Sequence, residues 1–237
     1  MLIKGFQKST LLDYPGKIAC TVFLFGCNFR CPYCHNPELV DSTLVTNTKI
    51  YTEEEIFQFL REHNKFLEGV CITGGEPMLN KDLPEFIRKI KRIGHYGVKL
   101  DTNGTNPEML ELLWKEKLAD YVAMDFKAPL EKYKEAVNAE VNIEALKKSV
   151  SIIKMFPNYE FRITAVPKLT TKQDILKIAW FLKENNANDL FTIQQFEPKK
   201  CLDKSFEKEK HYSEEELKDF QKMLKDYFKK VELRGLD

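Results

Sequence analysis

Three cysteines fall within eight residues of the sequence, in the stretch GCNFRCPYCHN that runs from Gly26 to Asn36. They are Cys27, Cys31 and Cys34, which gives a Cys-x3-Cys-x2-Cys spacing. Thiolates are soft ligands that suit zinc and iron–sulfur clusters. In a cytosolic chain of this size, clustered cysteines indicate metal binding or chemistry more than disulfides. What such a site does depends on where its remaining ligands come from.

Three interpretations of this triplet differ in the missing ligand. A zinc site would take His35 as fourth ligand, but His35 is adjacent to Cys34, whereas zinc sites normally draw ligands from two separated segments. A ferredoxin-like electron carrier needs four thiolates for each cluster, and Cys201 is distant in the sequence. A [4Fe–4S] cluster held by three thiolates leaves one iron open to bind a substrate, as catalytic metal sites do. The sequence favours this third interpretation.

Three further motifs each follow a short apolar run: TGGEP at Thr73–Pro77, DTNGT at Asp101–Thr105 and MDFKAP at Met124–Pro129. In the first, two glycines let the backbone approach a ligand closely, and Glu76 is an acceptor for an ammonium group. By itself the same motif is equally a tight turn. The second is typical of an Asn-Gly turn, and the third of a strand end with ordinary surface charges.

These motifs must be positioned by the elements around them. Short apolar runs predict strands at Ile18–Phe25, Val70–Thr73, Val98–Asp101, Tyr121–Met124, Glu160–Val166 and Leu190–Gln194. Amphipathic segments alternate with them near residues 53–63, 81–93, 107–117, 143–155 and 172–185, with a last one at 214–230 whose apolar stripe predicts packed core. Thr52 with Glu55, and Ser213 with Glu216, fit the capping box that starts a helix.

Alternation of strand and helix about six times predicts a parallel sheet with helices outside, closed only in part because a full barrel needs eight units. Ligands gather at the carboxyl ends of the strands in such folds. The cysteine triplet and the three other motifs all follow predicted strands. We therefore expect the four motifs to meet on one rim of an open barrel.

The triplet, with the aromatic Tyr33 before its last cysteine, resembles the signature of the radical S-adenosylmethionine (SAM) superfamily. The resemblance implies that the open iron chelates the amino and carboxylate groups of SAM. An electron from the reduced cluster would then cleave the sulfonium to methionine and a 5′-deoxyadenosyl radical. Gly74, Gly75 and Glu76 resemble the GGE motif of that superfamily, which receives the SAM amino group.

Two motifs resemble one branch of the superfamily, the activating enzymes of glycyl-radical enzymes. There a DTNG motif, here with Asp101, Thr102 and Asn103, and a D-x-K motif, here Asp125 and Lys127, lie at the SAM carboxylate and ribose. The resemblance implies that Lys127 faces the carboxylate. It also implies that Asp101, Thr102 and Asp125 can hold a monovalent cation.

Other positions match the branch in part. His35 and Asn36 complete its Cys-His-Asn ending and would contact the cluster or SAM. Arg162 matches an arginine on the fifth strand of the branch, although an arginine at a strand edge often simply extends to solvent. Pyruvate formate-lyase activating enzymes have a histidine near the end of the sixth strand that reaches the SAM ribose. The segment IQQFEP has none, so Gln195 or Gln194 would supply that hydrogen bond.

The stretch from Gly5 to Leu39 resembles activating proteins of anaerobic ribonucleoside-triphosphate reductase. The resemblance implies an α/β single-domain partial (β/α)6 barrel over residues 1–237, with a core at about 16–198 and a helical segment at 213–230. It implies a glycyl-radical enzyme as partner and a one-electron donor such as flavodoxin or ferredoxin. The alternatives are a pyruvate formate-lyase-type activating enzyme, a radical SAM enzyme acting on a small molecule, and a non-catalytic zinc or iron–sulfur binding module.

The composition of the chain bears on which surfaces it binds and where the protein is located. Lysine and arginine number 37 against 36 acidic residues, a net charge of +1 that argues against a nucleic-acid or acidic-membrane surface. No apolar run approaches the roughly 20 residues of a membrane span, and the start MLIKGFQKST lacks a signal-peptide core, so we expect a cytoplasmic protein. Cys20 and Cys71 lie in apolar stretches and are expected to be buried. Cys201 lies in a polar loop without an assigned role.

Overall fold

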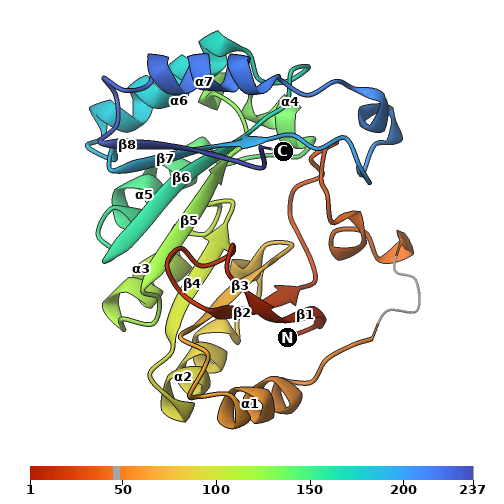
Figure 1. The fold of residues 1–237 in the computed structure, drawn as a ribbon, viewed down its shortest axis with the longest axis vertical. Helices are drawn as coiled ribbons and strands as arrows, with labels where there is room; N and C mark the ends of the chain where they lie inside the picture. Colours follow the sequence, from red (N-terminus) through yellow and green to blue (C-terminus); the bar gives the residue numbers. More distant parts are fainter. Residues whose placement is uncertain (45–48, 237) are drawn as a thin grey trace.

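The computed structural model describes residues 1–44 and 49–236, and within them eight strands form one sheet (Figure 1). The order of strands in the sheet is the order in the chain. The strands are β1 (Ile3–Thr10), β2 (Ala19–Leu24), β3 (Gly69–Gly74), β4 (Gly97–Thr102), β5 (Tyr121–Phe126), β6 (Asn158–Ala165), β7 (Leu190–Gln195) and β8 (Lys230–Arg234). The pair β1–β2 is antiparallel and all later pairs are parallel. β1 and β8 are the two end strands, so the sheet is an open barrel, as expected.

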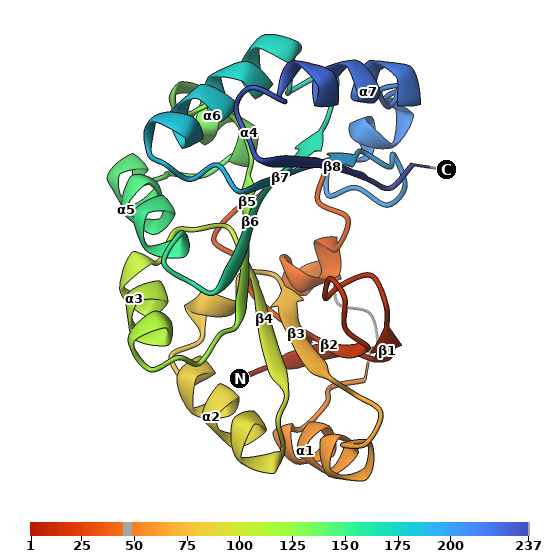
Figure 2. The same cartoon turned by 60° about the vertical axis from the view of Figure 1, so that its left-hand side comes forward.

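Helices cover the outer face of the curved sheet, which is clearest in Figure 2. They are α1 (Glu53–Glu62), α2 (Leu83–Ile93), α3 (Pro107–Lys115), α4 (Tyr133–Val137), α5 (Ile143–Ile153), α6 (Lys172–Glu184) and α7 (Glu214–Met223). Parallel neighbours need a crossover, and these helices supply the crossovers. Their buried stripes pack against the sheet in one continuous hydrophobic core. The concave inner face of the sheet is therefore not covered by these helices.

Local sequence explains where several helices begin. The predicted capping boxes of Thr52 with Glu55 and of Ser213 with Glu216 are both formed, and Thr171 makes a third at the start of α6. In each, the hydroxyl accepts a hydrogen bond from the third residue's backbone N–H, which would otherwise lack a partner. The six predicted strands are β2 to β7, with ends that agree to within two residues.

The carboxy-terminal segment differs from its prediction as a helix over residues 213–230. α7 ends at Met223, and the chain then turns into β8. The predicted stripe is nevertheless buried, since Leu217, Phe220, Leu224 and Phe228 are at most 6% exposed. Its helical spacing continues through the turn because Leu224 and Phe228 still face the core after the helix has ended. The alternation of charged and apolar residues in KVELR marks the strand that sequence analysis missed.

β1 was also missed, and it begins a segment that closes the amino-terminal end of the barrel. Its pairing with β2 shifts register twice, between Ile3 and Gly5 and between Gln7 and Thr10. The following loop brings the ring of Tyr14 to 6.0 Å from that of Tyr121, edge to face. Together with Ala19 and Ala123, these two tyrosines form a small second hydrophobic cluster inside the barrel.

The cysteines outside the triplet are buried. Cys20 and Cys71 are fully buried on β2 and β3, as predicted. Cys201 is 5% exposed despite its polar neighbours, because it packs into the main hydrophobic core. Each of the three is a free thiol.

Candidate functional site

The four motifs line one cavity of about 300 Å³ at the carboxyl ends of the strands. This is the arrangement that parallel strands predict, because their carboxyl ends share one edge. Fourteen of the predicted site residues lie in its wall: Cys27, Cys31, Tyr33, Cys34, His35, Asn36, Gly74, Gly75, Glu76, Asp101, Thr102, Asn103, Asp125 and Lys127. The remaining one, Gln195, does not.

The cysteine loop between β2 and α1 presents three free thiols to the cavity. Burial raises the pKa of all three, that of Cys31 to about 12, whereas the ammonium of Lys127 and nearby backbone N–H groups favour the thiolates. The backbone N–H of Phe29 donates to Cys27 Sγ at 3.4 Å. Buried thiols with N–H donors and a cation beside them fit an iron–sulfur cluster, whose negative charge such groups stabilise.

The ligand atoms of an iron–sulfur cluster also lie further apart than the ligand atoms of a single metal ion. Within residues 1–44 and 49–236, no three His, Cys, Asp or Glu side chains are grouped as ligands of one metal ion. In a cubane each thiolate binds its own iron atom, so its sulfurs stand further apart than those around zinc.

Gly74 and Gly75 bring the end of β3 against the cysteine loop. The N–H of Gly75 donates to Leu24 O at 2.8 Å, and the N–H of Glu76 donates to Gly26 O at 2.7 Å. A Cβ on Gly75 would overlap the Gly26 carbonyl, and Gly74 has φ +118°, a conformation that favours glycine. The close approach expected from the glycine pair is thus made toward another backbone segment.

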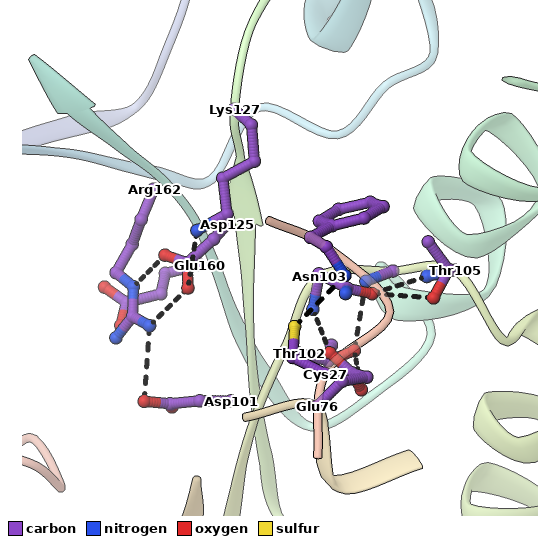
Figure 3. A network of polar contacts seen from close by, with 12 residues as sticks. Cys27, Glu76, Asp101, Thr102, Asn103, Thr105, Asp125, Lys127, Glu160 and Arg162 are labelled. Atoms are coloured by element: carbon purple, nitrogen blue, oxygen red, sulfur yellow. Dashed lines mark hydrogen bonds and ion pairs between the residues drawn. The ribbon is translucent and has the colours of Figure 1, made fainter. Parts of the chain in front are cut away.

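Glu76 fixes the turn that follows β4. Its carboxylate accepts hydrogen bonds from Asn103 N at 2.6 Å and from Thr102 Oγ1 at 2.8 Å (Figure 3). It also accepts one from Met78 N at 3.1 Å. The side chain is 1% exposed, and burial raises its pKa to about 7 against the effect of these hydrogen bonds. Glu76 therefore ties the second motif to the third.

A hydrogen-bonded triangle ties the third motif to the first. Asn103 Nδ2 donates to Asn28 Oδ1 at 2.8 Å, Asn28 Nδ2 donates to Thr105 Oγ1 at 2.9 Å, and Thr105 Oγ1 donates to Asn103 Oδ1 at 2.7 Å. Sequence analysis did not single out Asn28 or Thr105. The only available signal was their position inside the two motifs.

Arg162 on β6 binds both aspartates of the site. Its Nε donates to Asp125 Oδ1 at 2.8 Å, and its NH2 reaches Asp125 Oδ2 at 3.1 Å and Asp101 Oδ2 at 3.2 Å (Figure 3). Burial is the largest influence and would raise the pKa of each carboxyl group, but the charges of Arg162 and of the nearby lysines together outweigh it, so both pKa values lie below the ordinary range. Lys99, 1% exposed, holds the other oxygen of Asp101. Arg162 thus has an ionic role inside the barrel.

The monovalent cation site predicted at Asp101, Thr102 and Asp125 stays a prediction, and in the structure the side chains of these residues bind other protein groups. Asp101 and Asp125 are bridged by the Arg162 guanidinium, so the positive charge between them is a side chain. Thr102 Oγ1 turns away from them, since it donates to Glu76 and accepts from the N–H of Gly104 at 3.0 Å. Asp101 and Asp125 thus belong to one polar network in the structure and Thr102 Oγ1 to another.

Lys127 lies beside Asp125, on the side of that carboxylate that Arg162 does not bind most closely. Its Nζ is 3.7 Å from Asp125 Oδ2, which is longer than a charge-assisted hydrogen bond. Burial is the largest influence and would lower its pKa, but Asp125, Cys31 and Tyr133 together outweigh burial and raise the pKa above the ordinary value. Its ammonium is therefore charged and able to pair with a second carboxylate.

Gln194, rather than Gln195, lines the cavity. Successive residues of a strand point to opposite faces, and Gln195 Nε2 donates instead to Tyr212 O at 3.0 Å. His35 and Tyr33 line the cavity beside Phe196. Among the residues that the structure describes, the buried atoms His35 Nε2 and Tyr33 Oη have no hydrogen-bond partner. Buried polar atoms of this kind are suited to a ligand.

The loop after β7, residues 196–212, packs against the cysteine loop. The N–H of Asp203 donates to Pro32 O at 2.9 Å, and Lys200 pairs with Glu38 at 2.8 Å. This contact buries Cys201. A part of the chain without a recognised motif therefore supports the site.

The sequence model of the radical SAM superfamily matches residues 21–182, which include all four motifs. The chain belongs to the radical SAM superfamily. Its resident cofactors are accordingly a [4Fe–4S] cluster and SAM, and the three free thiols in the cavity wall fit the cluster. Like the family, it is an oxidoreductase-type enzyme.

Relatives and neighbours agree with this membership. The radical SAM chain is 39% identical, over its whole length and 97% of the relative, to a Methanocaldococcus jannaschii protein named among the glycyl-radical enzyme activating enzymes. Its fold is similar to that of Streptococcus suis SuiB bound to SAM, with TM-score 0.66 at 15% identity over 91% of this chain and 48% of SuiB. A domain of a Bacteroides vulgatus pyruvate-formate lyase-activating enzyme aligns with TM-score 0.57 at 19% identity, over 70% of this chain and 99% of that domain. Among the residues described, no helix is long and apolar enough to span a membrane.

Proposed function

We propose that this radical SAM enzyme generates a glycyl radical on a partner protein, and that the partner is anaerobic ribonucleoside-triphosphate reductase. The observation that carries the first part is the meeting of the cysteine triplet with the DTNG and D-x-K motifs around one cavity. The full-length relative supports it by its name. The choice of partner is supported by the resemblance of residues 5–39.

The chain's own side chains would bind and orient the cofactors. Cys27, Cys31 and Cys34 would hold the cluster, and Lys127 would pair with the SAM carboxylate. Once bound, the cluster and SAM supply a 5′-deoxyadenosyl radical that takes a hydrogen atom from the partner's glycine. No protein acid, base or nucleophile is needed, because the protein orients the cofactor and keeps water away from it.

The open sheet supports a protein substrate. β1 and β8 are its two ends, and Figure 1 shows the strands between them curving around a side that none of the helices α1 to α7 covers. A glycine loop of a large partner could enter from that side. A flavodoxin or ferredoxin in the cytoplasm would supply the electron.

The test is anaerobic reconstitution with iron and sulfide, followed by EPR spectroscopy with and without SAM. We expect a brown protein whose reduced signal changes when SAM is added, and a glycyl doublet when ribonucleoside-triphosphate reductase is also present. A doublet on pyruvate formate-lyase alone would correct the partner. Formation of 5′-deoxyadenosine without a doublet on either protein would favour a small-molecule substrate. A colourless zinc protein indifferent to SAM would refute the proposal.

Binding of SAM by Lys127 can be tested separately. Lys127→Ala should keep the cluster and weaken SAM binding, because the cation opposite the SAM carboxylate is lost. Lys115→Ala, which removes an exposed lysine of α3, is the matched control. Isothermal titration calorimetry measures both, and equal SAM affinity in the two variants would remove Lys127 from the site.

A further inference from the structure

Glu160 is a fully buried carboxylate on β6 that lies outside the four motifs. It accepts hydrogen bonds from Thr192 Oγ1 on β7 at 2.9 Å and from NH1 of Arg234 on β8 at 3.0 Å. NH2 of Arg234 lies 2.7 Å from its other oxygen, so the arginine binds it with two nitrogens. Arg162 follows two residues later on the same face of β6, with NH1 3.8 Å from Glu160 Oε1. Glu160 therefore lies between two guanidinium groups.

The distances from Arg162 show which carboxylates it binds most closely. It is 2.8 to 3.2 Å from Asp125 and Asp101, and further from Glu160. A buried carboxylate without a partner is strongly unfavourable, so Glu160 must have a cation within reach. While Arg234 fills that role, the Arg162 guanidinium is available to the two aspartates.

Loss of Arg234 would change this distribution. Glu160 would then draw Arg162 toward itself, because Arg162 is the remaining cation in contact with it among the described residues. Asp125 would in turn draw Lys127, whose Nζ is now 3.7 Å away. A lysine held more closely by Asp125 is less able to bind a second carboxylate.

We propose that Glu160 and Arg234 are positioning residues of the SAM site. Arg234, on the last strand, satisfies Glu160 and so keeps Arg162 on Asp101 and Asp125, which leaves the Lys127 ammonium for the carboxylate of SAM. This inference rests on the proposed function in taking Lys127 as the residue that binds SAM. It gives the carboxy-terminal strand a part in the site although its side chains do not line the cavity.

The test is a charge-balance cycle on the reconstituted protein, read out by calorimetric SAM affinity, iron content and the urea midpoint. Arg234→Met keeps most of the side-chain length and should weaken SAM binding about tenfold, within the usual range of coupling between sites. Glu160→Gln should leave affinity within about twofold, since the acid that competes for Arg162 is gone. The double variant should return to the affinity of Glu160→Gln. Arg234→Lys should restore most of the loss.

Lys229→Met is the control, because Lys229 is an exposed cation directly before β8 that pairs with Asp189, whereas Lys230 shares Glu232 with Arg234. It should leave SAM affinity unchanged. Wild-type affinity in Arg234→Met with full iron content would overturn the inference and leave the proposed function standing. A double variant as weak as Arg234→Met would also overturn it, because that result indicates packing alone.

A second variant covers the case in which Arg234→Met does not fold. Thr192→Val is nearly isosteric and removes one hydrogen bond to Glu160, so it should weaken SAM binding in the same direction by about threefold. Unchanged affinity in Thr192→Val would then overturn the inference. A wild-type protein that carries its cluster and binds no SAM would overturn the proposed function as well.

Discussion

The titration of Glu76 should appear in the pH dependence of the free energy of unfolding. Burial raises its pKa from 4.5 to about 7, so between these values the folded protein holds a proton that the unfolded chain has released. The contribution of Glu76 to the free energy of unfolding is then fully present below pH 4.5 and falls as pH rises toward 7. At about 1.4 kcal/mol per pH unit, an interval of about 2.5 units corresponds to about 3 kcal/mol. The side chain is 1% exposed, so solvent screening removes little of this.

The perturbation is Glu76→Gln, whose amide does not titrate. Its amide group would also face the N–H of Asn103, now 2.6 Å from a carboxylate oxygen, and two donors cannot pair. We therefore expect the variant to be less stable at pH 5 by about 1–3 kcal/mol and to lack the decline toward pH 7.

Urea unfolding of the cluster-free protein at intervals from pH 4.5 to 7.5 measures both effects. The difference between wild type and variant isolates Glu76, because other groups such as His35, whose pKa burial lowers, titrate in both proteins. From the acid to the neutral end the stability of the wild type relative to the variant should fall by about 3 kcal/mol, which removes or reverses the difference. A constant difference over the whole range would refute the reasoning.

Three further predictions concern the same site. Cys34→Ala should lose the cluster and all SAM cleavage, measured as iron, sulfide and 5′-deoxyadenosine; full 5′-deoxyadenosine production would overturn the ligand assignment. Gly75→Ala places its Cβ 2.6 Å from the Gly26 carbonyl carbon, so it should cost about 1–3 kcal/mol or more in thermal unfolding, and an unchanged melting temperature would contradict the packing. Arg162→Met leaves partly buried acids such as Asp125 without their main cation and should cost about 3 kcal/mol in urea unfolding at pH 7. That loss should diminish as pH falls below about 4, and a pH-independent loss would argue against an ionic cause.

The strands that could be predicted from the sequence are those that are buried on both faces of the sheet. β2 to β7 read as apolar runs because helices cover one face and the barrel interior the other. β1 carries IKGFQKST, where a glycine and two lysines interrupt the apolar pattern, and β8 alternates over only five residues. End strands have one neighbour and more solvent, so their sequences carry a weaker signal.

The meeting of the four motifs followed from one rule about parallel strands, but the contacts among them did not. Asp125 and Arg162 bind each other because they are directly opposed in the register of β5 and β6, which one sequence does not specify. The choice between Gln194 and Gln195 depends on a single residue of register, which reverses the face of every side chain. The bridging of Asp101 and Asp125 by the Arg162 guanidinium depends on the same pairing.

The two end strands bear on how the molecule behaves at high concentration. A bare strand edge invites pairing with a second copy, yet β1 is interrupted by two register shifts and carries Lys4 and Lys8. β8 is five residues long, with Lys230, Glu232 and Arg234 at alternate positions. Both margins of the sheet therefore discourage edge-to-edge aggregation. The open side of the barrel can therefore stay uncovered without strand pairing between copies of the protein.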